Sequence, residues 1–149
     1  MLLPQSRGYL ALRSPDPLEP PLIQPNYLAG DADMAILVKG VKLARRLAQT
    51  RAFAPFVDEA IQPQPAVQSD ADIRDYIRNH VSTVFHPVGT CKMGLDPMAV
   101  VNPQLQVHGM QGLRVADASI MPTIVNGNTN APAIMIGEKA ADLIKTTNS

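Results

Sequence analysis

The stretch "NGNTNAPAIMIGEKAADLI", residues 126–144, decides how the end of this chain folds. Its second part reads as an apolar helix, and Pro132 suits the first turn, so we predict a helix from Ala131 to Lys145. The apolar residues expected to face inward from this helix are Ile134, Met135, Ala141 and Ile144.

Three asparagines, Asn126, Asn128 and Asn130, crowd the start of this predicted helix. The first turn of any helix has unpaired N–H groups and partial positive charge. Asn128 or Asn130 can serve as a simple cap, but one helix needs only one. The surplus of amides, each able to donate and accept, therefore suggests that something polar is also held there, and a cofactor edge with partial negative charge would fit.

A second stretch, "FHPVGTCKMG", residues 85–94, fixes a histidine on a stiff turn. Pro87 restricts the backbone of His86, and Gly89 permits the close approach of another group. A neutral imidazole can accept a proton at cellular pH, although a buried core histidine fits the pattern equally well. We interpret His80 and His108 as packing or surface histidines, interpret the single cysteine as an apolar filler, and expect no metal site.

Asp117, in "LRVADAS", residues 113–119, follows a run that reads as a buried strand from Leu113 to Ala116. Ligands of α/β sheets often bind where strands end, although an ordinary turn aspartate is the alternative. A further short strand is expected at Leu105–Val107, joined to it by a glycine turn.

We expect an α+β fold, because the rest of the chain combines a predicted strand with two predicted helices. A strand is expected at Tyr9–Leu12, followed by extended, proline-rich sequence. An amphipathic helix of roughly five turns begins at Asp31, which is the expected N-cap. A second helix opens at Ser69, with Ser69 as its cap. The inward face of the first holds Met34, Leu37, Val38, Val41, Ala44 and Ala48, and that of the second Ile73, Tyr76, Ile77 and His80.

Composition excludes some classes of partner. Thirteen basic residues balance thirteen acidic ones among 149, so charge gives no case for nucleic acid. The N-terminus lacks a signal-peptide profile, and no apolar run reaches the ~20 residues of a transmembrane segment. We expect a cytoplasmic protein, for which peripheral membrane association stays open.

The blocks "FHPVGTCKMG", "VVNPQLQVHGMQGLRVADASIMPT" and "NGNTNAPAIMIGEKAADLI" occur in the order and spacing of one family. Together they resemble the C-terminal region of the glucose–methanol–choline (GMC) family of FAD-dependent oxidoreductases, choline dehydrogenase and bacterial alcohol dehydrogenase branches. The resemblance implies that an alcohol is oxidised to an aldehyde or ketone by hydride transfer to FAD. The family's catalytic histidine falls on His86, and its partner falls on Asn128.

The resemblance also implies cofactor contacts. Asp117 and Ala118 would lie near the FAD pyrophosphate and ribose, and Asn128, Thr129 and Asn130 beside the flavin ring. Asn102 stands where the family usually has aspartate, and we expect only a modest local effect. The family's two domains would divide the chain into a substrate-domain portion, residues 1–100, and the last strand and helix of the FAD domain, residues 101–149.

The family's Gly-x-Gly-x-x-Gly fingerprint does not occur in these 149 residues. We therefore expect a missing N-terminal FAD-binding portion, on the same or a separate chain, as a partner besides a small alcohol substrate. The isolated chain should bind FAD weakly and not turn over. A non-catalytic remnant of the same fold and an unrelated α+β binding protein are the alternatives.

Overall fold

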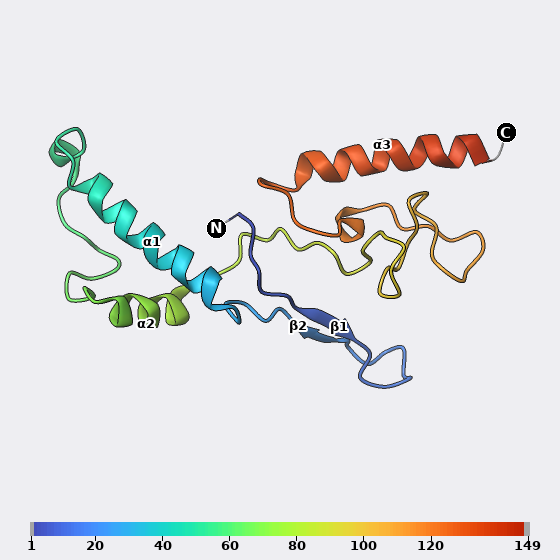
Figure 1. The fold of residues 1–149 in the computed structure, drawn as a ribbon, viewed down its shortest axis with the longest axis horizontal. Helices are drawn as coiled ribbons and strands as arrows, with labels where there is room; N and C mark the ends of the chain where they lie inside the picture. The colour runs from blue at the N-terminus through green and yellow to red at the C-terminus, as the bar shows by residue number, and fades with distance from the viewer. Residues whose placement is uncertain (1, 148–149) are drawn as a thin grey trace. The chain divides into compact units, whose positions relative to one another are not determined.

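The computed structural model describes residues 2–147, which form two helical units (Figure 1). The first unit spans Leu3–Thr83 and the second begins at Val84; each is described by itself. The mixture of helices and one small sheet confirms the α+β prediction, whereas the predicted domain boundary at residue 100 stays a prediction. The elements in chain order are β1 (Tyr9–Ala11), β2 (Leu22–Gln24), α1 (Asp31–Ala48), the 3-10 turn η1 (Ala54–Phe56), α2 (Asp70–His80), the 3-10 turn η2 (Ala118–Ile120) and α3 (Asn130–Thr147).

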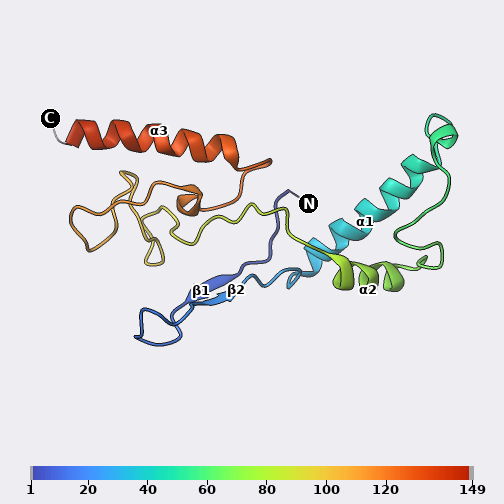
Figure 2. The same ribbon diagram turned by 180° about the vertical axis from the view of Figure 1, so that it is seen from behind.

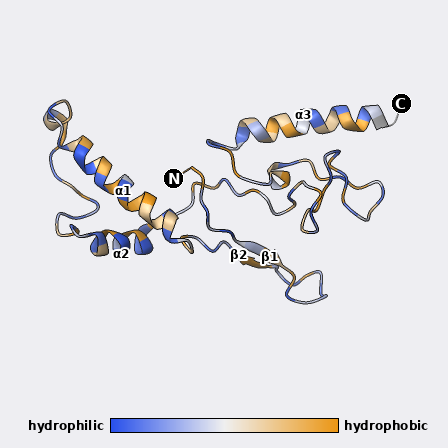
Figure 3. Cartoon of the chain, viewed as in Figure 1, coloured by the Kyte–Doolittle hydropathy of each residue, from blue (hydrophilic) through white to orange (hydrophobic). Residues whose placement is uncertain are grey.

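Helices α1 and α2 lie side by side in the first unit, as both ribbon views show (Figure 2). Their contact buries Met34 and Val38 of α1 against Ile73 and Ile77 of α2. The inward faces predicted for both helices are therefore confirmed at their centres, while Ala44 and His80 are exposed. Figure 3 shows the apolar and polar residues that alternate along α1, as expected for a helix with one buried face.

The N-terminus of α2 confirms the cap predicted from sequence. The Ser69 hydroxyl accepts the Asp72 N–H at 3.1 Å, and the Asp72 carboxylate accepts the Ser69 N–H at 3.0 Å, which makes a capping box. The cap predicted for α1 is wrong, because Gly30 holds that position and Asp31 is the first helical residue. Asp31 still lies in the first turn, where its negative charge suits the helix dipole.

The buried carboxylate of Asp33 fixes the N-terminal segment to the start of α1. It accepts hydrogen bonds from Gln5 N at 2.8 Å, from Ser6 N at 2.8 Å and from the Ser6 hydroxyl at 2.5 Å. The same hydroxyl accepts the Gly30 N–H at 3.0 Å. Burial by itself raises the pKa of Asp33, but these hydrogen bonds outweigh it, so the pKa lies below its ordinary value.

Strands β1 and β2 form an antiparallel pair in which Tyr9 lies opposite Gln24 and Ala11 opposite Leu22. The prediction of a strand at Tyr9–Leu12 is confirmed to within one residue. The second, proline-flanked segment was expected to be extended, and the structure adds its pairing with the first. Gly8 allows this close approach, since a side chain there would meet the backbone of Gln24 and Pro25.

The second unit packs loops around one face of α3. Its buried core consists of Val101, Leu105, Ile120, Met121, Ile136 and Ala140. The face predicted for α3 is wrong: Ile134, Met135, Ala141 and Ile144 are exposed, and Ile136 and Ala140 point inward. Because α3 is apolar over much of its circumference, periodicity alone does not select the buried side.

The strands predicted at Leu105–Val107 and Leu113–Ala116 are also wrong, since these segments make only isolated bridges. Val101 pairs with Val107, and Gln106 with Arg114. Leu105 has a left-handed backbone, with φ of 65°, which interrupts the pleat of a strand. Within residues 2–147, no helix combines the length and the apolar character needed to cross a membrane.

Candidate active site

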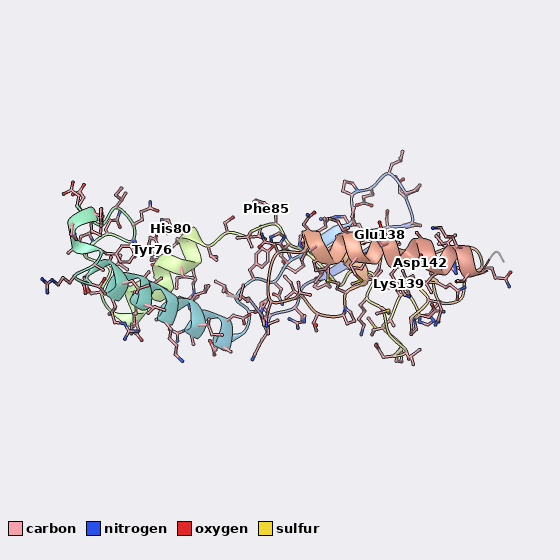
Figure 4. The ribbon with its side chains drawn as sticks, turned by 90° about the horizontal axis from the view of Figure 1, so that it is seen from above. Tyr76, His80, Phe85, Glu138, Lys139 and Asp142 are labelled. Atoms are coloured by element: carbon pink, nitrogen blue, oxygen red, sulfur yellow. The ribbon has the colours of Figure 1, made fainter. Side chains whose placement is uncertain are left out.

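His86 lies on a turn whose backbone is constrained on both sides. Phe85 adopts φ of 62°, a left-handed conformation that is costly for a bulky residue, and the residue is 80% exposed. Pro87 follows directly, and Gly89 adopts φ of 86°, close to the carbonyl oxygen of Met121. Figure 4 labels Phe85 on the chain that leads into this turn. The turn therefore presents the half-buried imidazole of His86 in a defined direction.

The imidazole of His86 contacts a residue 43 positions further along the chain. Its Nδ1 atom lies 2.9 Å from Oγ1 of Thr129, a hydrogen-bonding distance. In the described part of the chain, Nε2 of the same ring has no hydrogen-bond partner. One ring nitrogen is thus held by the protein, and the other is available to a ligand.

Thr129 stands at the N-cap position of α3. Its carbonyl oxygen accepts the Ala133 N–H at 3.0 Å, which is the first hydrogen bond of the helix. The prediction that Asn128 or Asn130 caps this helix is therefore wrong. Both amides are exposed, next to the partly positive helix start, and Asn128 directly precedes the residue that holds His86.

Asp117 also reaches this region through its backbone neighbours. Its carboxylate accepts the Ser119 N–H at 2.7 Å and caps η2. The Ser119 hydroxyl and this backbone N–H lower the pKa of Asp117, which leaves an exposed carboxylate at the turn. The backbone carbonyl oxygen of Ser119 accepts the Cys91 N–H at 3.0 Å, so the aspartate turn and the histidine stretch are joined.

The second unit therefore brings together three sequence-predicted stretches: residues 85–94, 117–121 and 128–130. The other two histidines, His80 and His108, make hydrogen bonds elsewhere and are not part of this site. Nδ1 of His80 lies 2.9 Å from the Tyr76 carbonyl oxygen, and its ring stacks on Tyr76 (Figure 4). Nε2 of His108 lies 3.1 Å from the Gly94 carbonyl oxygen. Among residues 2–147, no three histidine, cysteine or acidic side chains are grouped so that they could hold a metal ion.

Asn102, at the position where the resemblance predicts an aspartate, holds the local turn through its side chain. Its Oδ1 accepts the N–H groups of Gln104 at 2.9 Å and Gln106 at 3.0 Å, which a carboxylate would do equally well. Its Nδ2 donates to the Gln106 side chain at 3.0 Å. The turn therefore keeps the acceptor that it needs.

Sequence reasoning assigned Thr129 only to the cofactor and missed its contact with His86. The available signal was a hydroxyl residue at the start of a helix beside a surplus of amides. That signal indicates a cap, but it does not reveal which distant side chain the hydroxyl meets.

Comparison with known proteins places this arrangement in a family. Residues 4–137 match the GMC oxidoreductase family. The chain is 50% identical over 143 residues to "Alcohol dehydrogenase [acceptor]" of Pseudomonas putida, which covers 96% of this chain and 26% of that protein. It is also 50% identical over 142 residues to human mitochondrial choline dehydrogenase, which covers 94% of this chain and 24% of that one.

Solved structures agree. A FAD-dependent oxidoreductase from Chaetomium thermophilum superposes with a TM-score of 0.90 at 29% identity, over 99% of this chain and 26% of that one. Pyridoxine 4-oxidase from Mesorbium loti gives a TM-score of 0.84 at 32% identity, over 95% and 28% respectively. The chain thus spans about a quarter of the length of these relatives. It belongs to the GMC oxidoreductase family, whose C-terminal region it represents.

Proposed function

We propose that this chain forms the C-terminal part of an enzyme that oxidises a small alcohol to an aldehyde or ketone with FAD as cofactor. The observation that carries the proposal is the 2.9 Å contact between His86 Nδ1 and Thr129 Oγ1. It brings a histidine whose Nε2 is available to a ligand to the asparagine-rich start of α3. The similarity to an alcohol dehydrogenase and to choline dehydrogenases supports an alcohol as the substrate class.

The residues present fit FAD. Exposed amides of Asn128 and Asn130 and the partly positive start of an 18-residue helix suit an electron-rich ring edge. The proposed contacts are Asp117 and Ala118 for the ribose and pyrophosphate, and Asn128, Thr129 and Asn130 for the ring. When bound, FAD accepts the hydride from the alcohol carbon.

In this proposal, His86 takes the hydroxyl proton of the substrate at Nε2, the nitrogen that Thr129 does not occupy. The Asn128 amide donates a hydrogen bond to the same substrate oxygen and stabilises the negative charge that develops on it. Because an amide does not exchange protons at neutral pH, the base function falls on His86 alone. Two fixed groups on one oxygen also orient the alcohol for the transfer.

The test is anaerobic reduction of the flavin in the complete enzyme that carries this chain. We expect His86→Ala to slow reduction by roughly 10²- to 10⁴-fold, the usual contribution of a general base, while FAD remains bound. His108→Ala is the matched control, since that ring contacts Gly94 in the same unit. Unchanged reduction in His86→Ala would remove the assignment.

A second test measures FAD binding and turnover of this chain by itself. We propose that it requires an FAD-binding portion, on the same or a separate chain, and therefore that the 149-residue chain binds FAD weakly and does not turn over. A yellow, active preparation of this chain alone would contradict that requirement. A complete enzyme that binds FAD but is reduced by no alcohol would favour the non-catalytic remnant.

A further inference from the structure

The three histidines of this chain have hydrogen-bond partners of two chemical kinds. His80 and His108 each face a backbone carbonyl, through Nδ1 and Nε2 respectively. A carbonyl only accepts, so the facing nitrogen carries the proton and the tautomer of each ring is fixed. His86 faces the hydroxyl of Thr129, which can either accept or donate.

We propose that Thr129 is the positioning residue of the catalytic histidine: its Oγ1 accepts a hydrogen bond from Nδ1–H of His86. This inference rests on the proposed function. With the proton of the neutral ring on Nδ1, the lone pair of Nε2 is free to take the proton of the substrate hydroxyl. The opposite arrangement, in which Thr129 donates to Nδ1, leaves a proton on Nε2 and gives the ring no base at the substrate.

The same contact suits the ring after it has accepted a proton. Both nitrogens of an imidazolium are donors, so Nδ1–H continues to donate to Oγ1. The hydrogen bond therefore persists through proton uptake, and the ring does not need to turn. Proton transfer at Nε2 then requires no rearrangement of the protein on the Nδ1 side.

Both partners of the contact are anchored independently. The carbonyl oxygen of Thr129 accepts the first hydrogen bond of α3 from Ala133, so its position follows that of the helix. His86 is held from its own side by the left-handed residues Phe85 and Gly89. Thr129 thus ties the imidazole to the same helix start that we propose for the flavin ring.

Two substitutions separate the hydroxyl from the shape of the side chain. Thr129→Val removes the hydroxyl and keeps the branched shape, and Thr129→Ser keeps the hydroxyl. Urea unfolding of each variant shows whether the fold is retained.

The first readout is the ¹⁵N chemical shift of the ring nitrogens in the histidine-labelled chain, at a pH at which the rings are neutral. His80, with its proton on Nδ1, and His108, with its proton on Nε2, are internal references. We expect the Nδ1–H tautomer for His86 in the unmodified chain and in Thr129→Ser, and a mixture of tautomers in Thr129→Val. A neutral His86 with its proton on Nε2 in the unmodified chain would overturn the proposal, whatever the variants do.

The second readout is flavin reduction in the complete enzyme, measured as a double-mutant cycle. Because a misplaced base costs about 10- to 100-fold, we expect Thr129→Val to slow reduction by that factor and Thr129→Ser to recover most of it. In a His86→Ala background, Thr129→Val should cost nothing further, since Thr129 acts through His86. A full additional loss in that background would overturn the proposal, because the Thr129 hydroxyl would then act independently of His86.

The two proposals can fail separately. If His86→Ala leaves reduction unchanged, the proposed function loses its base, while the tautomer measurement still reports on the contact. If His86→Ala abolishes reduction but Thr129→Val does not slow it, the base stands and the positioning role of Thr129 is refuted.

Discussion

The Asp33 carboxylate offers the sharpest prediction about how the first unit is held together. It is fully enclosed and accepts three hydrogen bonds from Gln5 and Ser6, which lie more than 25 residues away in the sequence. Asp33→Asn keeps the size and shape of the side chain. The amide, however, has one acceptor atom instead of two and carries no charge.

The magnitude follows from these contacts. A hydrogen bond to a charged group contributes about 1.5–3 kcal/mol, roughly twice a neutral one. The asparagine loses the charge on all three bonds and turns an N–H donor toward a backbone N–H. We therefore expect the free energy of unfolding to fall by roughly 2–4 kcal/mol, a large share of the ~5–15 kcal/mol of a typical domain.

The assay combines urea unfolding, followed by helical circular dichroism, with hydrogen exchange at the donor amides. Gln5 and Ser6 should lose protection in Asp33→Asn. Asp31→Asn is the matched control, because Asp31 is an exposed carboxylate in the same helical turn. Its loss should cost only the helix-dipole contribution of about 0.3–1 kcal/mol. Equal stability of Asp33→Asn and the unmodified chain, with Gln5 and Ser6 still protected, would refute the reasoning.

The lowered pKa of Asp33 also predicts how the free energy of unfolding depends on pH. Because the folded pKa of Asp33 is lowered, the stabilisation is complete above the unfolded pKa of about 3.9 and is lost as the pH falls through the lower folded value. The difference in unfolding free energy between Asp33→Asn and the unmodified chain should therefore shrink in this acidic range. A difference that stays constant down to that range would show that the charge is not the cause.

Three further substitutions test local structure. Ser69→Ala removes half of the capping box with Asp72 and should destabilise α2 by about 1 kcal/mol in urea unfolding, whereas Ser69→Thr should retain it. Gly8→Ala should disrupt the pairing of β1 with β2, because its Cβ would meet the backbone at Gln24; exchange protection of the strand amides that survives the change would contradict this. Asn102→Asp should leave thermal stability nearly unchanged and Asn102→Ala should lower it by about 1–3 kcal/mol, since only the alanine leaves two turn N–H groups without an acceptor; equal melting temperatures would count against this account.

The sequence predicts those features of this chain that local chemistry decides. Ser69 and the acidic residues after it specify the start of α2, and the apolar spacing of Met34, Val38, Ile73 and Ile77 identifies the faces that pack. These predictions hold because cap and core residues interact within a few turns of where the pattern is read.

Features that depend on distant neighbours could not be predicted in this way. The buried side of α3 is set by the core around Val101 and Leu105, so its apolar residues alone gave the wrong face. The run from Leu113 to Ala116 has strand composition but lacks continuous pairing in this chain. The contact of His86 with Thr129 joins residues 43 positions apart, and no local pattern encodes such a pairing.

The central claim of the proposed function is that His86 is the only base for the oxidation of the alcohol. The most direct measurement is the pH dependence of anaerobic flavin reduction in the complete enzyme, for the unmodified protein and for His86→Gln. In the unmodified protein, we expect the rate to rise with pH to a plateau, as one group loses its proton. In His86→Gln, whose amide forms hydrogen bonds but accepts no proton, we expect a much slower rate without that rise. The same rise and the same plateau in both proteins would contradict the claim.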